Sequence, residues 1–314
     1  MTLKEKIEQL KQQRNAVILA HYYTESEVQD AADFVGDSLA LAQRAATTEA
    51  DTILFAGVHF MGETAKILSP EKTVLMPDMA AGCSLADSCR AEEFGAFVAA
   101  HPDHTVISYV NTTAEVKALT DIVCTSSNAI QIVESLPAGE PIIFGPDRNL
   151  GNYIKNVTGR ENMLIWDGAC HVHEEFSLEK ILALKAEHPE AKILTHPECK
   201  RPIVLVSDYV GSTAGLLKFA AEDRSADTYI VVTEPGVLHQ MKKAAPGKRF
   251  IPAPPTDSTC GCNNCNYMKL VTLQKMADAL ERMEPQIVVP EEVRVRAEGA
   301  IRRMLDISQR LGLV

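Results

Sequence analysis

Short runs of consecutive apolar residues alternate along the chain with segments whose apolar residues recur every three or four positions. Runs such as AVILA at 16–20 and TILFAG at 52–57 have the length of strands that are buried on both faces. Segments such as SLALAQRAA at 38–46 have the spacing of amphipathic helices. The alternation predicts βα units, and therefore an α/β fold with parallel sheets covered by helices.

This pattern occurs three times, with landmarks at nearly constant spacing. After a short β-rich run comes a pair of polar residues two positions apart: His21 and Tyr23, Tyr109 and Asn111, His196 and Glu198. Twelve positions after the first member of each pair stands an aspartate, and five positions later a hydroxyl residue: Asp33 and Ser38, Asp121 and Ser126, Asp208 and Thr213. Each copy ends in cysteine: Cys83, Cys170, and a group at Cys260, Cys262 and Cys265. Four landmarks in three copies argue for an internal repeat.

The repeat predicts three similar small α/β domains at residues 1–86, 87–172 and 173–266. We expect their parallel sheets to be related by a pseudo-threefold axis around a central cavity. Functional groups of parallel α/β units lie at the carboxyl ends of the strands, so the landmarks of all three copies would face that cavity. Segment 267–314 has apolar residues at helical spacing, and we expect two helices there that pack on the first repeat.

Composition and charge indicate the class of protein and exclude some kinds of binding partner. The 314 residues include 46% hydrophobic and 23% charged side chains, which is typical of a globular protein. Thirty-one basic and 42 acidic residues give a net charge of −11, so we expect no nucleic-acid partner. The N-terminus lacks the pattern of a signal peptide, and no run of 18 apolar residues occurs. We therefore expect a cytoplasmic protein with no membrane partner.

The eight cysteines are too few and too scattered for a disulfide scaffold in a chain of this length. One cysteine from each repeat, converging on an axis, would make a site of three thiolates. Zinc would need a fourth ligand, and the C-x-C-x-x-C segment at 260–265 lacks the second C-x-x-C of a zinc ribbon. An iron-sulfur cluster on three thiolates would leave one iron open as a Lewis acid. Spacing alone leaves zinc, iron-sulfur and buried structural cysteines as alternatives.

Several long motifs follow one another over almost the whole chain: ILAHYY, QDAADFVGDSL, CSLAD, YVNTTAEVKALTDIVCTSSNA, FGPDRNLG, CHVH, HPEC, SDYVGST and CNYMK. In this order they resemble the quinolinate synthase family, the iron-sulfur dehydratases of NAD biosynthesis. The family's three α/β domains around a central cavity agree with the repeat. The resemblance implies condensation of iminoaspartate with dihydroxyacetone phosphate to give quinolinate, phosphate and two waters. It also implies a 4Fe-4S cluster with one open iron, and a functional coupling to the enzyme that supplies iminoaspartate.

Carried over by position, the resemblance assigns the cluster to Cys83, Cys170 and Cys265. Cys265 is preferred to Cys260 and Cys262 because the family's third ligand precedes a short segment that ends in Met, as in CNYM here. A regulatory disulfide between Cys262 and Cys265 would compete with ligation. The remaining cysteines are interpreted as structural or pocket-lining: Cys89, Cys124 and Cys199.

The chemistry that the resemblance implies also gives the polar residues acid, base and substrate-binding roles. Tyr23 and Glu198, which hold the same place in two repeats, would do the acid and base work together with His21. We expect a cationic pocket or cluster to shift the pKa of Tyr23 downward, and Glu198 to accept a carbon-bound proton. Helix N-termini would help to bind the anionic substrates. The expected substrate-binding residues are His21, Ser38, Tyr109, Val110, Asn111, Ser126, His173, His196, Pro197, Glu198 and Thr213.

Three alternative interpretations stay open at this point. Ser38, Ser126 and Thr213 could be mere N-caps of the helices that follow them, a role that needs no ligand. A zinc hydrolase or lyase could use the same cysteines with His173 or His196. A non-enzymatic redox or iron sensor could use the cluster alone, but it would not need polar residues from three repeats aimed at one cavity.

Overall fold

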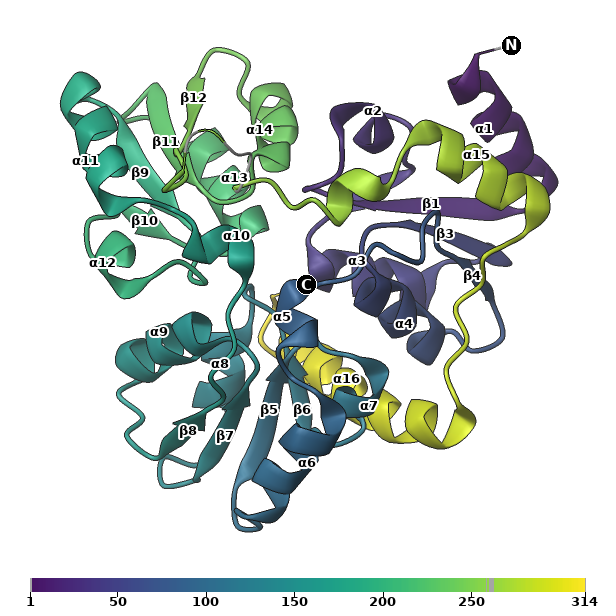
Figure 1. Cartoon of the computed structure of the whole chain (residues 1–314), viewed down its shortest axis with the longest axis horizontal. Helices are drawn as coiled ribbons and strands as arrows, with labels where there is room; N and C mark the ends of the chain where they lie inside the picture. The colour runs from purple at the N-terminus through teal and green to yellow at the C-terminus, as the bar shows by residue number, and fades with distance from the viewer. Residues whose placement is uncertain (1, 258, 260–262, 314) are drawn as a thin grey trace.

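The computed structural model describes residues 2–257, 259 and 263–313. It contains three separate four-stranded sheets, each entirely parallel and flanked by helices, so the predicted α/β class is confirmed. All three sheets have the same strand order, with the first strand of the repeat between the second and the third and the fourth at the edge. The sheets lie in separate lobes around the centre of the molecule (Figure 1). The pseudo-threefold axis itself stays a prediction.

The elements of the first repeat are α1 Leu3–Gln13, β1 Ala16–His21, α2 Ser26–Gln29, β2 Phe34–Gly36, α3 Ser38–Thr47, β3 Thr52–Ala56, α4 His59–Leu68, β4 Thr73–Leu75 and α5 Ser84–Asp87. Those of the second are α6 Ala91–Ala99, β5 Thr105–Tyr109, α7 Ala114–Lys117, β6 Ile122–Cys124, α8 Ala129–Glu134, β7 Ile142–Gly145, α9 Arg148–Thr158, β8 Met163–Ile165 and α10 His171–Glu174.

The third repeat contains α11 Leu178–Glu187, β9 Lys192–Thr195, α12 Arg201–Val204, β10 Tyr209–Val210, α13 Thr213–Glu222, β11 Thr228–Val232, the 3-10 turn η1 Pro235–Val237, α14 Leu238–Ala244 and β12 Arg249–Pro252. The terminal segment adds η2 Met268–Leu270, α15 Leu273–Arg282 and α16 Glu291–Arg310. None of the helices in the described ranges is long and apolar enough to cross a membrane.

The repeated aspartate has the same structural role in all three copies. Its Oδ2 accepts a hydrogen bond from a backbone N–H of the first strand: Asp33 from Ile18 at 2.8 Å, Asp121 from Val106 at 2.9 Å, Asp208 from Ile193 at 2.7 Å. The aspartate N–H donates in turn to the carbonyl of the same partner. These bonds hold the short edge strand that follows each aspartate: β2, β6 and β10. Pattern analysis missed these strands because two or three residues are too few to show a period.

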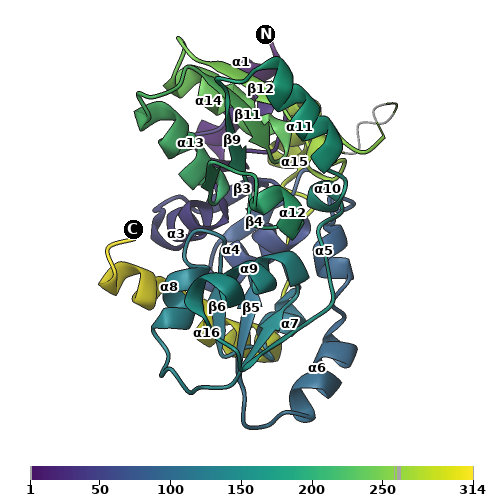
Figure 2. The same ribbon diagram turned by 90° about the vertical axis from the view of Figure 1, so that its left-hand side faces the viewer.

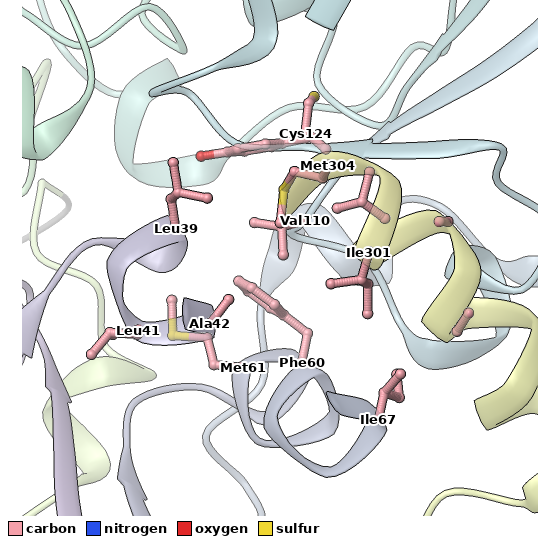
Figure 3. Packing of buried hydrophobic residues seen from close by; sticks show 14 of the residues in the cluster. Leu39, Leu41, Ala42, Phe60, Met61, Ile67, Val110, Cys124, Ile301 and Met304 are labelled. Carbon is pink, nitrogen blue, oxygen red and sulfur yellow. The ribbon is translucent and has the colours of Figure 1, made fainter. Parts of the chain in front are cut away.

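The two terminal helices pack on different parts of the molecule. Helix α15 lies against α1 and β3 of the first repeat, as expected. Helix α16 lies mainly against β6 and α7 of the second repeat and also contacts α4 of the first; in Figure 2 it runs beside β6 and α7. Its Ile301 and Met304 belong to one buried apolar cluster with Phe60 and Val110 (Figure 3). The expectation that both helices pack on the first repeat is therefore incomplete for α16, which packs mainly on the second, because helical periodicity reveals an apolar face but not its partner.

Candidate functional site

One cavity at the meeting point of the three repeats is lined by thirteen of the predicted site residues. These are His21, Tyr23, Ser38, Cys83, Tyr109, Asn111, Ser126, Cys170, His173, His196, Glu198, Thr213 and Cys265. The cavity lies at the carboxyl ends of β1, β5 and β9, where parallel α/β units place their functional groups. The repeat therefore brings polar side chains and thiols from distant parts of the chain to one place.

Two residues predicted for the site, Val110 and Pro197, do not line this cavity. Val110 is 1% exposed and packs in the apolar cluster shown in Figure 3. Pro197 is buried. Each stands between the two members of a polar pair, in the bend or turn that follows β5 or β9. The outer members of the pair face the cavity, and the middle residue does not line it.

Each candidate ligand cysteine directly precedes a helical turn. Cys83 precedes α5, Cys170 precedes α10, and Cys265 precedes the turn that leads into η2. The carbonyl of each cysteine accepts a hydrogen bond from the N–H four residues later, at 2.9, 3.0 and 3.2 Å respectively. Backbone N–H groups of the same turn also bond to the sulfur and lower the pKa of the thiol. All three sulfurs thus lie at the start of a helical turn, an arrangement that favours a thiolate.

Burial works against ionisation of these thiols. It raises the pKa of Cys83 to about 12, that of Cys265 to about 11, and that of Cys170 well above its ordinary value. The thiols also interact electrostatically with one another. Because of this interaction, Cys265 raises the pKa of both Cys83 and Cys170. A bound metal would lower the pKa of these thiols, since its positive charge stabilises thiolates. Three neighbouring thiols with N–H groups aimed at them are therefore a donor set suited to a metal centre.

A second group of ligand atoms overlaps this set. One ligand atom each from Cys170, His173 and Glu198 lies within 4.8 Å of the others, and these three form the one such trio in the part of the chain that the structure describes. Cys83 and Cys265 are outside that trio although they line the same cavity.

The alternatives to Cys265, namely Cys260 and Cys262, lie outside the described residues. The same holds for the disulfide considered between Cys262 and Cys265. The structure therefore bears on Cys265 alone among these three positions.

Glu198 is a buried carboxylate that lies beside the imidazole rings of His173 and His196. Its Oε2 lies 2.9 Å from Nδ1 of His173, and its Oε1 lies 3.8 Å from Nδ1 of His196. Burial alone would raise the pKa of Glu198, but the neighbouring His173 and a hydrogen bond from Tyr109 outweigh burial and lower that pKa to about 2. Glu198 is therefore ionised at neutral pH.

His21 and His196 occupy equivalent places and are held in the same way. The Nδ1 atom of each accepts from the backbone N–H two residues later, that of Tyr23 at 3.2 Å and that of Glu198 at 3.4 Å. Burial lowers the pKa of both imidazoles to about 3, so both are neutral at pH 7. With Nδ1 as an acceptor, the proton lies on Nε2. In His196 this atom is 3.2 Å from Oγ of Ser126, and both rings can donate a hydrogen bond from Nε2.

The hydroxyl of Tyr23 lies 2.7 Å from Oγ1 of Thr213 and 2.8 Å from Oγ1 of Thr233. The expectation that its surroundings lower the pKa of Tyr23 is wrong for the residues of this chain. Burial raises that pKa well above its ordinary value, and the carboxylates of Glu198 and Glu234 raise it further, against the effect of the two threonines. The reason is that burial and nearby negative charge both disfavour a phenolate. Tyr23 therefore keeps its proton at neutral pH and can act as a donor.

The three repeated hydroxyl residues are not N-caps. Ser38 and Thr213 are the first residues of α3 and α13, and the caps are the residues before them, Asp37 and Ser212. Ser126 lies in the turn before α8, whose N-cap position is 128. The interpretation of these hydroxyls as mere caps is therefore wrong, and all three line the cavity.

Two of these N-caps, Asp37 of the first repeat and Ser212 of the third, are linked through Ser127 of the second repeat. The hydroxyl of Ser127 donates to Oδ2 of Asp37 at 2.6 Å and lies 2.8 Å from Oγ of Ser212. Sequence analysis did not single out Asp37, although it stands directly beside Ser38 and also lines the cavity. The signal available was an aspartate immediately before a predicted helix, where a cap is expected.

Sequence analysis also missed Glu234, which lines the cavity and is 0% exposed. Its Oε1 lies 3.1 Å from Nζ of Lys269, which also donates to the carbonyl of Tyr23 at 2.8 Å. This ion pair connects the third repeat to the segment after Cys265 and to the end of β1. The available signal was a carboxylate immediately after a buried strand, in the segment TYIVVTEPG.

Comparison with known proteins identifies the family of this chain. The family model described as quinolinate synthetase A protein (NadA) matches residues 5–306. A quinolinate synthase from Synechococcus sp. is 57% identical over 299 residues, which cover 95% of this chain and 93% of the relative. One from Thermosynechococcus vestitus is 56% identical over 302 residues, covering 96% and 94%, and one from Trichodesmium erythraeum is 55% identical over 306 residues, covering 98% and 94%. The chain therefore belongs to the quinolinate synthetase A family.

Proposed function

We propose that this enzyme is a quinolinate synthase that condenses iminoaspartate with dihydroxyacetone phosphate. The products would be quinolinate, phosphate and two waters, which balances the atoms of the two substrates. The observation that carries the proposal is the cavity itself: each repeat contributes a cysteine at the start of a helical turn and a set of polar side chains. The names of the relatives and their near-complete coverage of the chain support the same activity.

We propose that Cys83, Cys170 and Cys265 hold a 4Fe-4S cluster. When bound, such a cluster supplies an iron without a protein ligand, which acts as a Lewis acid toward a substrate oxygen. The fit rests on the donor set: three thiols at one cavity, each with backbone N–H groups at its sulfur. Cys89 and Cys124 do not line this cavity and are buried in the core.

The substrates carry a phosphate and two carboxylates, so the cavity must bind anions. The N-termini of α3 and α13 begin at its wall, and helix N-termini favour negative charge without adding net charge. His21 and His196 offer neutral N–H donors. Asn111 has a buried Oδ1 without a hydrogen-bond partner among the described residues, so a bound donor group would satisfy it.

The acid and base roles follow from the charges of the free site. Tyr23 keeps its proton, so it would donate a hydrogen bond or a proton to a departing or developing oxygen. Glu198 is ionised beside His173, so it would accept a proton from carbon, and His173 would hold the resulting acid in place. Tyr109 bonds to Glu198 and would orient it.

The cluster assignment is tested by single alanine variants purified without oxygen. Changing Cys83, Cys170 or Cys265 should abolish the brown 4Fe-4S chromophore and the stoichiometric iron and sulfide. Changing Cys89, Cys124 or Cys199 should leave both unchanged, because these cysteines are outside the ligand set. Iron retained in Cys265→Ala but lost in Cys260→Ala or Cys262→Ala would show that the third ligand is misassigned.

The same analysis separates this proposal from a zinc enzyme. The trio of Cys170, His173 and Glu198 could ligate a single ion. A colourless protein that contains zinc and no sulfide, and that loses zinc in His173→Ala, would contradict the cluster. Quinolinate formation from the two proposed substrates is the matching assay for activity.

We also place the enzyme in the cytoplasm. Six cysteines among the described residues carry free thiols, as expected in a reducing compartment. Iminoaspartate hydrolyses readily, so the enzyme that produces it would act together with this one.

A further inference from the structure

Two buried carboxylates occupy equivalent places in the second and third repeats. Asp147 stands two residues after Gly145, the last residue of β7, and Glu234 stands two residues after Val232, the last residue of β11. Gly145 and Val232 pair in register with equivalent residues of the neighbouring strands. The two carboxylates are 87 positions apart, which is also the separation of the polar pairs, the aspartates and the hydroxyl residues of these repeats. Both are 0% exposed.

Each carboxylate divides its oxygens between the same two tasks, and Oε1 of Glu234 in addition pairs with Nζ of Lys269 at 3.1 Å. One oxygen caps the helical turn that follows the strand, at 2.8 Å from a backbone N for Asp147 and 2.7 Å for Glu234. The other oxygen accepts from the backbone N–H of a candidate ligand cysteine. Asp147 Oδ2 is 3.2 Å from N of Cys170, and Glu234 Oε1 is 3.4 Å from N of Cys265. In both repeats the carboxylate thus ties the cysteine loop to the end of a core strand.

The loop that carries Cys170 lies very close to this strand end. The N–H of Gly168 donates to the carbonyl of Pro146 at 3.1 Å, and the carbonyl of Gly168 accepts from N of Arg148 at 2.8 Å. A Cβ at position 168 would lie 2.4 Å from the carbonyl oxygen of Pro146. Only glycine permits this approach, so the cysteine loop is docked on the strand end by backbone as well as by Asp147.

The first repeat lacks the carboxylate. Its equivalent position is Val58, two residues after Ala56, and a valine side chain cannot accept a hydrogen bond. There a backbone bond alone connects the strand end to the cysteine loop, from N of His59 to the carbonyl of Ala81 at 2.7 Å. The carboxylate is therefore an addition in two repeats and not a requirement of the fold.

We propose that Asp147 and Glu234 are positioning residues of the metal centre, which hold Cys170 and Cys265 in the orientation needed for ligation. The inference rests on the proposed assignment of these cysteines as cluster ligands. When a residue that orients a metal ligand without touching the metal is removed, metal affinity typically falls by roughly 10-fold to 100-fold.

The test uses Asp147→Ser and Glu234→Ser. Serine is an effective N-cap, so it can keep the first task, but it is too short to reach the cysteine N–H as well. Each variant and the parent are loaded with ferrous iron and sulfide without oxygen, and cluster loss to an iron chelator is followed by absorbance. We expect loss about 10-fold faster or more in both variants, with the thermal midpoint of the metal-free chain nearly unchanged.

A matched control is Glu63→Ala. Glu63 is also a buried carboxylate that accepts a backbone N–H, that of Ala114 at 3.1 Å, but it joins α4 to α7, and among the described residues no hydrogen bond or ion pair connects its side chain to a cysteine loop. This variant should unfold at lower temperature yet lose its cluster at the parental rate. Equal loss rates in the parent and both serine variants, or equally fast loss in Glu63→Ala, would overturn the inference.

If a serine variant does not fold, the amide variant at the same position, Asp147→Asn or Glu234→Gln, is used instead. The amide has the shape of the carboxylate but only one acceptor oxygen, which cannot serve both the helical turn and the cysteine N–H. The reduced clusters of these variants should then give an altered electron paramagnetic resonance spectrum, and an unchanged spectrum would overturn the inference. A parent chain that binds no cluster would instead contradict the proposed cofactor, and this inference with it. A parent that binds the cluster, with variants that keep it equally well, contradicts the positioning role alone.

Discussion

Tyr23 and Glu198 hold the second place in equivalent polar pairs, but their surroundings give them opposite charge states. The phenol is buried near two carboxylates, which raises its pKa, whereas the carboxylate lies against His173 and accepts a hydrogen bond from Tyr109, which lower its pKa. At neutral pH one is therefore a proton donor and the other an acceptor. A donor and an acceptor in one cavity are what a dehydrating condensation requires.

Removing either function should slow turnover without loss of the fold. Tyr23→Phe and Glu198→Gln should each lower turnover by roughly 10²-fold or more, the usual scale for a general acid or base. Steady-state quinolinate formation and iron content measure the two quantities. Tyr229→Phe is the matched control, since Tyr229 is a buried tyrosine with a bonded hydroxyl outside the cavity. Rates within threefold of the parent would reduce Tyr23 and Glu198 to a positioning role.

Helices α3 and α13 begin at the cavity with a hydroxyl at their first position and a separate cap before it. The N-cap side chain already accepts a hydrogen bond from a backbone N–H of the helix. The hydroxyl of the next residue has no such role in the helix. Ser126 provides a third hydroxyl from the turn before α8, beside His196. We propose that these elements present three side-chain donors to anions in addition to the helix N-termini.

Ser38→Ala, Ser126→Ala and Thr213→Ala should each weaken the binding of succinate or inorganic phosphate roughly 10-fold to 100-fold. A hydrogen bond to a charged group contributes about 1.5 to 3 kcal/mol, which corresponds to this range. Calorimetric titration of the cluster-loaded enzyme measures the affinity. Thr272→Ala is the control: Thr272 caps α15 by accepting from N of Lys275 at 3.3 Å, so its loss should cost about 1 kcal/mol of stability and leave affinity unchanged. Unchanged affinity in all three cavity variants would contradict the anion site.

The cavity depends on the relative placement of the three repeats. Asp37, Ser127 and Ser212 connect them through side chains. Helix α16 adds an apolar connection, since its buried face packs against both the first and the second repeat. A buried hydrogen bond from Asn128 to Ser308 at 2.9 Å fixes the end of this helix on the second repeat.

Met304→Ala should therefore destabilise the whole protein and not only the terminal helix. Met304 is 0% exposed, and truncation of a buried methionine to alanine typically costs about 2 to 5 kcal/mol. Urea unfolding followed by circular dichroism measures the change. Val295→Ala, on the same helix but 53% exposed, should change the free energy of unfolding by no more than about 0.5 kcal/mol. A similar small change for Met304→Ala would show that α16 does not hold the repeats together.

The amino-acid sequence alone was sufficient for the repeat, the α/β class and thirteen of the residues that line the cavity. Spacing carries this information because equivalent positions of parallel βα units fold to equivalent places. Thus spacing alone groups Ser38, Ser126 and Thr213, and all three line one cavity. The ligand role of Cys83, Cys170 and Cys265 stays a prediction until iron is measured.

The tertiary structure decided everything that depends on neighbours from distant parts of the chain. The partner of α16, the direction of the pKa shift of Tyr23 and the bonds from Asp147 and Glu234 to the cysteine loops all belong to this class. A helical period shows that a face is apolar, and a residue type shows that a group can ionise. Burial, desolvation and hydrogen bonding across repeats depend on which surfaces meet, and that is set only when the whole chain packs.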